Sequence, residues 1–189
     1  MGEMVLVLDQ QIANLFYSWR SPILTGIMIF ITNLGSTLII VVLGLVIFWL
    51  ISRRDLKKEA WRFLMTLSGG AIMNNLLKEI IKRPRPLLIS PLVNETTYSF
   101  PSGHTMNATV LYLLIVFYIF KFLKGNRFKW VYASSLMCLV VLIGMSRIYL
   151  GVHSPSDVVA GFLAGVLWLI TVVLVEKLMT LAKKRRSVK

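Results

Sequence analysis

Residues 146–157 read Ser146-Arg147-Ile148-Tyr149-Leu150-Gly151-Val152-His153-Ser154-Pro155-Ser156-Asp157 and join two apolar segments of the chain. This junction contains a guanidinium, an imidazole and a carboxylate. Ser154, Pro155 and Asp157 have the spacing of an N-cap, a first-turn proline and a capping-box acid. The stretch therefore predicts a helix that begins at Ser154, with His153 just before its N-terminus.

The position of His153 predicts an uncharged imidazole. The positive end of the helix macrodipole disfavours imidazolium and leaves a neutral, nucleophilic ring nitrogen. Asp157, four residues further along, is placed to accept a hydrogen bond from the other ring nitrogen. The alternative interpretation of this stretch is a polar cap between two membrane helices.

The composition indicates an integral membrane protein. Hydrophobic residues make up 57% of the chain and charged residues only 15%, which is more apolar than an ordinary soluble domain. With their flanks included, the charge-free runs approach or exceed the length that a membrane helix needs. These runs are Ser21–Ser52, Phe63–Leu77, Thr105–Phe120, Trp130–Ser146 and Val158–Val175.

The expected fold is an all-α bundle of about five to six transmembrane helices with an N-terminal interfacial helix. The first run is too long for one straight span, so we place a break near Gly35-Ser36. Gly161 and Gly165 predict close packing of the last helix within the chain. We expect one membrane-embedded domain over residues 1–189, with an interfacial segment at 1–20 and a basic cytoplasmic tail at 183–189.

The distribution of charge argues for a membrane and against nucleic acid as the partner. The net charge is +13, and fifteen of the 21 Lys and Arg residues follow the first, third and last spans. The positive-inside rule assigns these alternate connections and the C-terminus to the cytoplasm. The other six fall at the outer ends of spans, where positive charge needs a reason of its own: Arg20, Lys78, Lys82, Arg83, Arg85 and Arg147.

Two further polar stretches lie at the same outer face. Residues 78–86 end the second span, where charged side chains are costly and normally face a site. Pro101-Ser102-Gly103-His104 opens the third span with a natural N-cap, a glycine that permits close approach to the backbone, and free helix amides that favour an anion. Each stretch alone is a weak signal, because headgroup-facing basic residues and helix-opening turns are common.

The three stretches together supply what phosphoryl transfer needs. They contain three fixed cations, a helix N-terminus with a glycine, and both histidines of the chain. These groups can neutralise phosphoryl oxygens, attack phosphorus and donate a proton. The candidate residues are Lys78, Arg85, Ser102, Gly103, His104, Arg147, His153 and Asp157.

These motifs resemble the tripartite signature of the type 2 phosphatidic acid phosphatase family, which shares its site with vanadium haloperoxidases. The matching elements are a lysine, six residues and Arg-Pro in 78–86, Pro-Ser-Gly-His in 101–104, and Ser-Arg, five residues, His, three residues and Asp in 146–157. All three are complete, in order, and on one side of the topology drawn from the charges. In character the resemblance extends over residues 30–175.

The resemblance implies a role for each candidate. His153 would attack phosphorus in line to give a phosphohistidine, with Asp157 orienting its ring. His104 would protonate the departing oxygen and then deprotonate the hydrolytic water, so that a bell-shaped pH profile is expected. No metal or other cofactor is implied. The phosphoryl oxygens would be bound by Lys78, Arg85, Arg147, Ser102 and the Gly103 amide.

We therefore expect a metal-independent lipid phosphatase of the cell membrane, acting at the extracytoplasmic face. The motif residues are expected to bind only the phosphate group. The candidate substrates are therefore undecaprenyl pyrophosphate, phosphatidylglycerophosphate, phosphatidic acid and lysophosphatidic acid. Two alternatives stay open: a lipid phosphotransferase on the same site, and a non-catalytic membrane protein that binds anionic headgroups. A haloperoxidase is disfavoured, because that chemistry is associated with soluble helical proteins. The oligomeric state is open.

Overall fold

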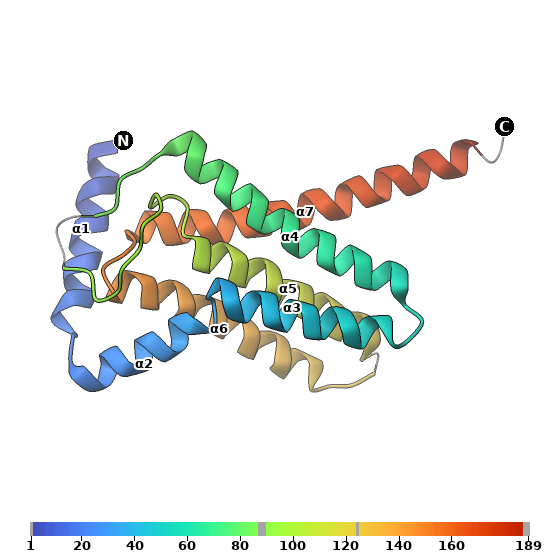
Figure 1. The fold of residues 1–189 in the computed structure, drawn as a ribbon, viewed down its shortest axis with the longest axis horizontal. Helices are drawn as coiled ribbons and strands as arrows, with labels where there is room; N and C mark the ends of the chain where they lie inside the picture. The colour runs from blue at the N-terminus through green and yellow to red at the C-terminus, as the bar shows by residue number, and fades with distance from the viewer. Residues whose placement is uncertain (1, 87–89, 124, 187–189) are drawn as a thin grey trace.

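The structure is a computed structural model that describes residues 2–86, 90–123 and 125–186. Its secondary structure over these residues is entirely helical, as predicted (Figure 1). The helices are α1 (Gly2–Ser18), α2 (Pro22–Asn33), α3 (Thr37–Ser52), α4 (Lys57–Ile81), α5 (Gly103–Phe122), α6 (Lys129–Tyr149) and α7 (Pro155–Arg186).

Helix α5 forms the centre of the bundle and packs against α3, α4, α6 and α7. Many of its side chains are enclosed, and Ala108, Val110 and Leu111 are fully buried, whereas Phe117 is exposed. A helix that is apolar on most of its faces is either enclosed by other helices or spans a membrane. The surrounding helices instead expose large apolar side chains on their outer faces, which is the pattern of a bundle that faces lipid.

Three helices, α5, α6 and α7, are long and apolar enough to cross a membrane. Helices α2 and α3 together are also long and apolar enough, and they add a fourth span if they form one span with a break. The two helices are bent by 43° at that break. The break lies at the predicted Gly35-Ser36, and the Ser36 hydroxyl caps α3 by accepting from the Ile39 amide. Helix α4 has 25 residues but is charged near both ends. The described residues thus give three to four spans by length and composition, fewer than the five to six expected.

Helix α1 covers one end of the bundle. It runs across this end in Figure 1 and contacts α6 and α7. The predicted N-terminal helix is therefore present, and its location at a membrane interface stays a prediction. At the other terminus, residues 183–186 continue α7 as helix, and residues 187–189 of the predicted tail lie outside the described residues.

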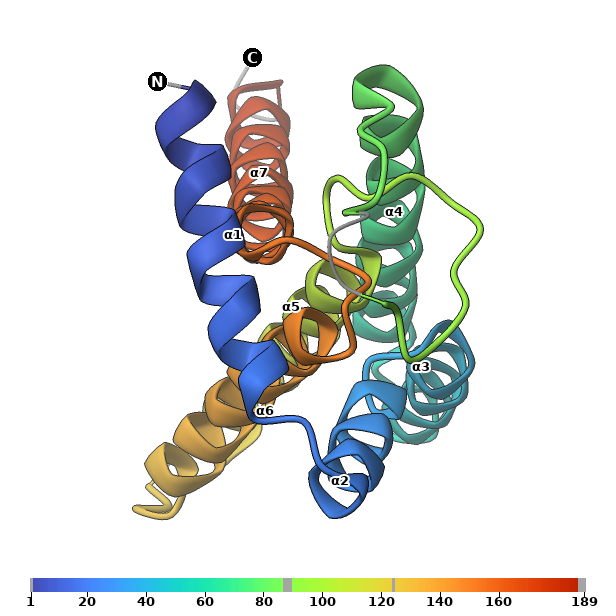
Figure 2. The same cartoon turned by 90° about the vertical axis from the view of Figure 1, so that its left-hand side faces the viewer.

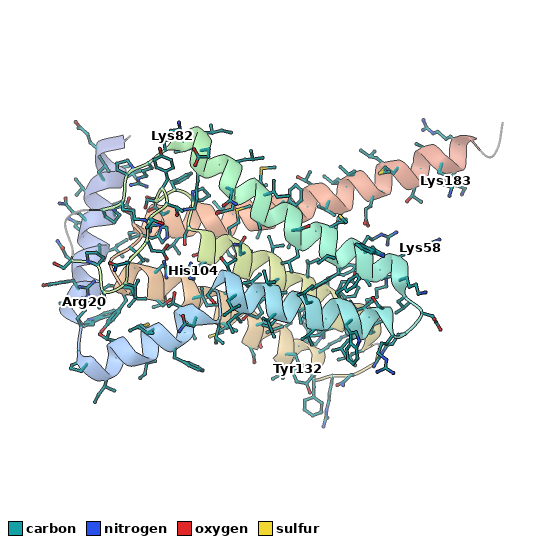
Figure 3. All side chains as sticks on the ribbon, viewed as in Figure 1. Arg20, Lys58, Lys82, His104, Tyr132 and Lys183 are labelled. Atoms are coloured by element: carbon teal, nitrogen blue, oxygen red, sulfur yellow. The ribbon has the colours of Figure 1, made fainter. Side chains whose placement is uncertain are left out.

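The two ends of the bundle carry different side chains. Arg20, Lys82 and His104 lie toward the end covered by α1, and Lys58 and Lys183 lie toward the other (Figure 3). The alternate connections that hold most of the basic residues therefore gather at one end, opposite both histidines.

Close packing of α7 on α5 depends on Gly161 and Gly165. A Cβ atom at Gly161 would lie 2.6 Å from the Ser102 carbonyl oxygen, and one at Gly165 would lie 2.8 Å from Thr109 Cβ. The predicted contact within the chain is confirmed. Because Gly161 rests on Ser102, this contact also fixes the turn that opens α5.

We predict that Gly161→Ala lowers the stability of the protein in detergent. The added methyl meets backbone atoms that cannot move aside, and overpacking of this kind costs about 1–3 kcal/mol. The matched control is Gly26→Ala in α2, where an added Cβ has no atom within 4 Å. Thermal unfolding should show a lower midpoint for Gly161→Ala alone; equal midpoints for the two variants would contradict the packing argument.

Candidate active site

The three motif stretches converge at the end of the bundle that α1 covers. Figure 2 looks onto this end, where the junction between α6 and α7 lies between α1 and α4, and the connection formed by residues 90–102 passes across α4. The backbone joins two of the stretches directly, since the Ser102 amide donates to the Asp157 carbonyl oxygen at 3.0 Å. The C-terminal end of α4 and the turn before α5 are joined by the Ser99 amide, which donates to the Arg83 carbonyl oxygen at 2.9 Å.

His153 is buried at the junction, just before α7 begins at Pro155. Its Nε2 atom lies 3.5 Å from Arg85 Nη1, and its Nδ1 atom faces Asp157. Burial lowers the pKa of His153 to about 4; Asp157 opposes this shift, and the nearby Arg147 and Arg85 reinforce it. The ring is therefore neutral at pH 7. The helix dipole predicts a neutral ring at this position, but the main cause of the lowered pKa is desolvation by burial.

Asp157 is fully buried and its carboxylate is saturated with donors. It accepts from the Ser154 amide at 2.9 Å, from Arg83 Nη1 at 2.7 Å and from the Ser99 hydroxyl. The distance from its Oδ2 atom to His153 Nδ1 is 3.6 Å, which is too long for a hydrogen bond. The predicted direct bond is therefore absent, because the other donors occupy the carboxylate and the Ser99 hydroxyl approaches Nδ1 to 3.5 Å.

Arg147 brings a buried guanidinium to the pocket from the last turn of α6. Its Nη1 atom donates to the Thr32 hydroxyl at 2.9 Å, and Nη2 forms an ion pair with Glu95. Its Nε atom is buried and has no hydrogen-bond partner among the described residues. Leaving a buried donor unsatisfied costs about 1–3 kcal/mol, so the atom is suited to an anionic ligand.

Thr97 in the loop before α5 holds the other two motif cations. Its carbonyl oxygen accepts from Arg85 Nε at 2.8 Å, and its hydroxyl accepts from Lys78 Nζ at 3.4 Å. Arg85 also donates to the Val152 carbonyl oxygen at 2.8 Å, beside His153. Loop and junction contacts therefore fix Arg85 next to the imidazole and tie Lys78 to the same loop.

The turn 101–104 supplies the remaining candidates. Ser102 occupies the N-cap position of α5 without a side-chain cap bond, contrary to the usual pattern. Its hydroxyl oxygen instead accepts from Thr105 at 2.9 Å, which leaves its own proton free. A Cβ atom at Gly103 would lie 3.1 Å from the Asn74 amide oxygen, so only glycine fits easily. His104 interacts electrostatically with Arg147 and His153, and its ring makes no hydrogen bond within the described part of the chain.

Glu95 is the charged residue in contact with two predicted site residues that the sequence motifs did not indicate. Its carboxylate pairs with Arg147 and lies 3.6 Å from Arg85 Nη2. Burial raises the pKa of Glu95, but the charge and hydrogen bond of Arg147, helped by His104 and Arg85, lower it overall. The group is therefore ionised at neutral pH. A single acidic residue in a loop belongs to no motif, and the same holds for Thr32, Thr97 and Ser99, so none of the four could be predicted from the sequence.

The structure thus brings all eight predicted residues to one end of the bundle. Two imidazoles and three cations gather here, and two of these cations, Arg147 and Arg85, pair with the Glu95 carboxylate. Such a pocket can bind a phosphoryl group and attack it. No group of three or more His, Cys, Asp or Glu side chains suited to a metal occurs in residues 2–86, 90–123 and 125–186.

The chain is similar to known proteins both in sequence and in fold. Phosphatidylglycerophosphatase B of Bacillus subtilis is 38% identical over 169 residues, which cover 84% of this chain and 78% of that protein. Undecaprenyl-diphosphatase BcrC of the same organism is 26% identical over 154 residues, covering 79% and 74%. The crystal structure of a transmembrane PAP2-type phosphatidylglycerolphosphate phosphatase from Bacillus subtilis superposes with a TM-score of 0.83 at 32% identity, covering 92% of this chain and 87% of that one.

The family assignment follows from the sequence match itself. Residues 59–179 match the PAP2 superfamily, and this segment contains the motif stretches 78–86, 101–104 and 146–157. Both relatives named above are phosphatases by name, which confirms the class of enzyme predicted from the motifs. The chain belongs to the PAP2 superfamily.

Proposed function

We propose that this protein is an integral membrane phosphatase that hydrolyses a lipid phosphate or pyrophosphate through a phosphohistidine at the extracytoplasmic face. The observation that carries the proposal is the anion position formed by Arg147 and Arg85 beside the neutral ring of His153. A phosphoryl group at this position has its oxygens on the guanidinium groups and its phosphorus next to Nε2. The names of the relatives support phosphatidylglycerophosphate and undecaprenyl diphosphate as the first substrates to test.

The first chemical step is attack of His153 Nε2 on phosphorus. The N–P bond forms as the P–O bond to the lipid breaks, and the ring becomes positively charged. Asp157 stabilises that charge from the Nδ1 side at 3.6 Å. Arg85 and Arg147 stabilise the charge that builds on the phosphoryl oxygens, and the Gly103 amide at the start of α5 contributes in the same way.

His104 serves the leaving group and then the water. Its ring lies at the N-terminus of α5 and is not tied to another described side chain. It donates a proton to the lipid oxygen that departs, and in the second step it accepts a proton from the water that attacks the phosphohistidine. Hydrolysis returns both rings to their starting states.

Glu95 occupies the position of the substrate in the unliganded protein. Its carboxylate neutralises Arg147 and Arg85, which would otherwise repel each other in a buried site. A phosphoryl group carries more charge and more acceptor oxygens than a carboxylate, so it can replace Glu95 on both guanidinium groups. Glu95 therefore competes with the substrate while holding the empty pocket together.

We predict that His153→Ala abolishes phosphate release without unfolding the protein. Release should be measured in detergent on phosphatidylglycerophosphate, undecaprenyl pyrophosphate, phosphatidic acid and lysophosphatidic acid, with thermal unfolding as the check on folding. Mass balance between free phosphate and phosphorylated lipid separates hydrolysis from phosphotransfer. Parent-like rates in the variant would contradict the proposed nucleophile, and binding without turnover in the parent protein would favour a headgroup-binding protein.

We predict that Glu95→Gln binds inorganic phosphate roughly fivefold to tenfold more tightly than the parent, because it removes the competing charge from the anion position. Isothermal titration and the thermal shift produced by phosphate both measure this change. Glu59→Gln is the matched control, since Glu59 pairs with Lys121 at 3.5 Å near the opposite end of the bundle. Weaker or unchanged phosphate binding in Glu95→Gln would show that the carboxylate does not occupy the phosphate position.

The proposed sidedness predicts which introduced cysteines an impermeant reagent reaches. Ser90 lies at the site end, where its carbonyl oxygen accepts from Arg20, and Asn126 lies in the connection between α5 and α6. Both variants should be made in a Cys138→Ala background, because Cys138 is exposed. Labelling of intact cells should modify Ser90→Cys and spare Asn126→Cys. The reverse pattern would place catalysis in the cytoplasm.

A further inference from the structure

Arg83 lies between two carboxylates at the edge of the site. Its Nη1 atom donates to Asp157 Oδ1 at 2.7 Å, and its Nη2 atom donates to Asp9 Oδ2 at 3.0 Å. One planar guanidinium therefore bridges the two acids. Because a guanidinium fork has fixed geometry, it can hold both carboxylates in defined orientations, as a lysine ammonium cannot.

Asp9 comes from α1 and is buried despite its charge. Its Oδ1 atom accepts from the Ser156 amide at 2.8 Å, and its Oδ2 atom accepts from the Ser156 hydroxyl. Asp9 thus binds a free amide in the first turn of α7, one residue before Asp157. It lies outside residues 59–179, the segment that matches the family, so its role is not contained in the three motifs.

We propose that Arg83 is a positioning residue for Asp157, and that Asp9 holds Arg83 in place, so that docking of α1 across the end of the bundle sets the orientation of the carboxylate behind His153. This inference rests on the proposed function of His153 as nucleophile. Neither Arg83 nor Asp9 contacts the anion position formed by Arg147 and Arg85. Both side chains therefore act on the reaction through the first turn of α7, where they contact Ser156 and, for Arg83, Asp157.

Arg83 also changes the electrostatic environment of the His153 ring. The groups that face or act on the ring are Asp157 from α7, Arg147 from α6, His104 from α5, and Arg85 and Ser99 from the connection between α4 and α5. Arg83 offsets the negative charge of Asp157 directly. Without Arg83, the carboxylate stabilises imidazolium more strongly, and a higher pH is needed to keep the nucleophile neutral.

The central experiment compares Arg83→Gln with the parent protein in kcat, KM and pH profile on one lipid phosphate in detergent. We expect kcat to fall roughly tenfold to a hundredfold, as for other losses of precise orientation, while KM changes less than about twofold because the phosphate contacts are intact. The acid limb of kcat/KM should move to higher pH. Arg83→Lys keeps the charge but not the fork, so it should restore the parent acid limb and recover only part of kcat.

Asp9→Asn tests whether α1 acts through Arg83. In the parent background it should lower kcat by about threefold or more, and in the Arg83→Gln background by less than about twofold, because only the contact of Asp9 with Ser156 is then left to weaken. Equal losses in the two backgrounds would show that Asp9 does not act through Arg83, and would overturn this part of the proposal.

Arg62→Gln is the matched control. It removes an arginine from another ion pair between helices, Arg62 with Glu176 at 2.9 Å, which does not contact the site. This variant should keep the parent kcat and pH profile. An Arg83→Gln enzyme that matches it in kcat and acid limb would overturn the positioning role, whereas a parent protein that turns over no lipid phosphate would overturn the proposed function instead.

Discussion

Burial of the Arg147 guanidinium is the constraint on which the rest of the site depends. A charged group inside a bundle is costly unless partners satisfy it, and here the partners come from separate parts of the chain. Thr32 is supplied by α2 and Glu95 by the loop before α5. One cation thereby ties α2, α6 and this loop together, and its Nε atom, which has no hydrogen-bond partner among the described residues, is left for an anionic ligand.

The chemistry of the pocket follows from how little water reaches it. Burial keeps His153 neutral, and Arg85 and Arg147 beside it favour the same state. In the proposed mechanism the same two arginines bind the phosphoryl group, so the features proposed to bind the substrate also keep the proposed nucleophile uncharged. In the proposed mechanism Asp157 stabilises the ring once it becomes cationic, and contacts with Ser154, Ser99 and Arg83 already hold its carboxylate for this role.

Sequence reasoning succeeded where the physical cause is local. Ser154-Pro155 marks the start of α7 and Gly35-Ser36 marks the break before α3, because the capping and the ends of a helix are decided by neighbouring residues. The motif spacings likewise led to the eight residues that converge. The number of spans was less well predicted, since α4 has the length of a membrane helix but carries charge near both ends.

Residues whose role arises only from tertiary convergence could not be predicted. In the sequence Glu95 is only an acidic residue in a loop; its role depends on tertiary contacts with Arg147 and Arg85. Asp9 is likewise only one polar residue of an amphipathic helix, and its role depends on the packing of α1 against α7. The separation of His153 Nδ1 from Asp157 also depends on Ser99, which belongs to none of the three motifs. Such contacts connect segments far apart in the chain, and no spacing rule within one segment reports them.

The most direct measurement of the central claim is the chemical identity of the intermediate. The protein should be mixed with lipid phosphate and quenched in alkali, which preserves phosphohistidine, and its peptides analysed by mass spectrometry. The account predicts a phosphoryl group on His153 in the peptide that follows Arg147. A phosphoryl group on His104, or turnover with no phosphorylated histidine under conditions that trap the intermediate, would contradict it.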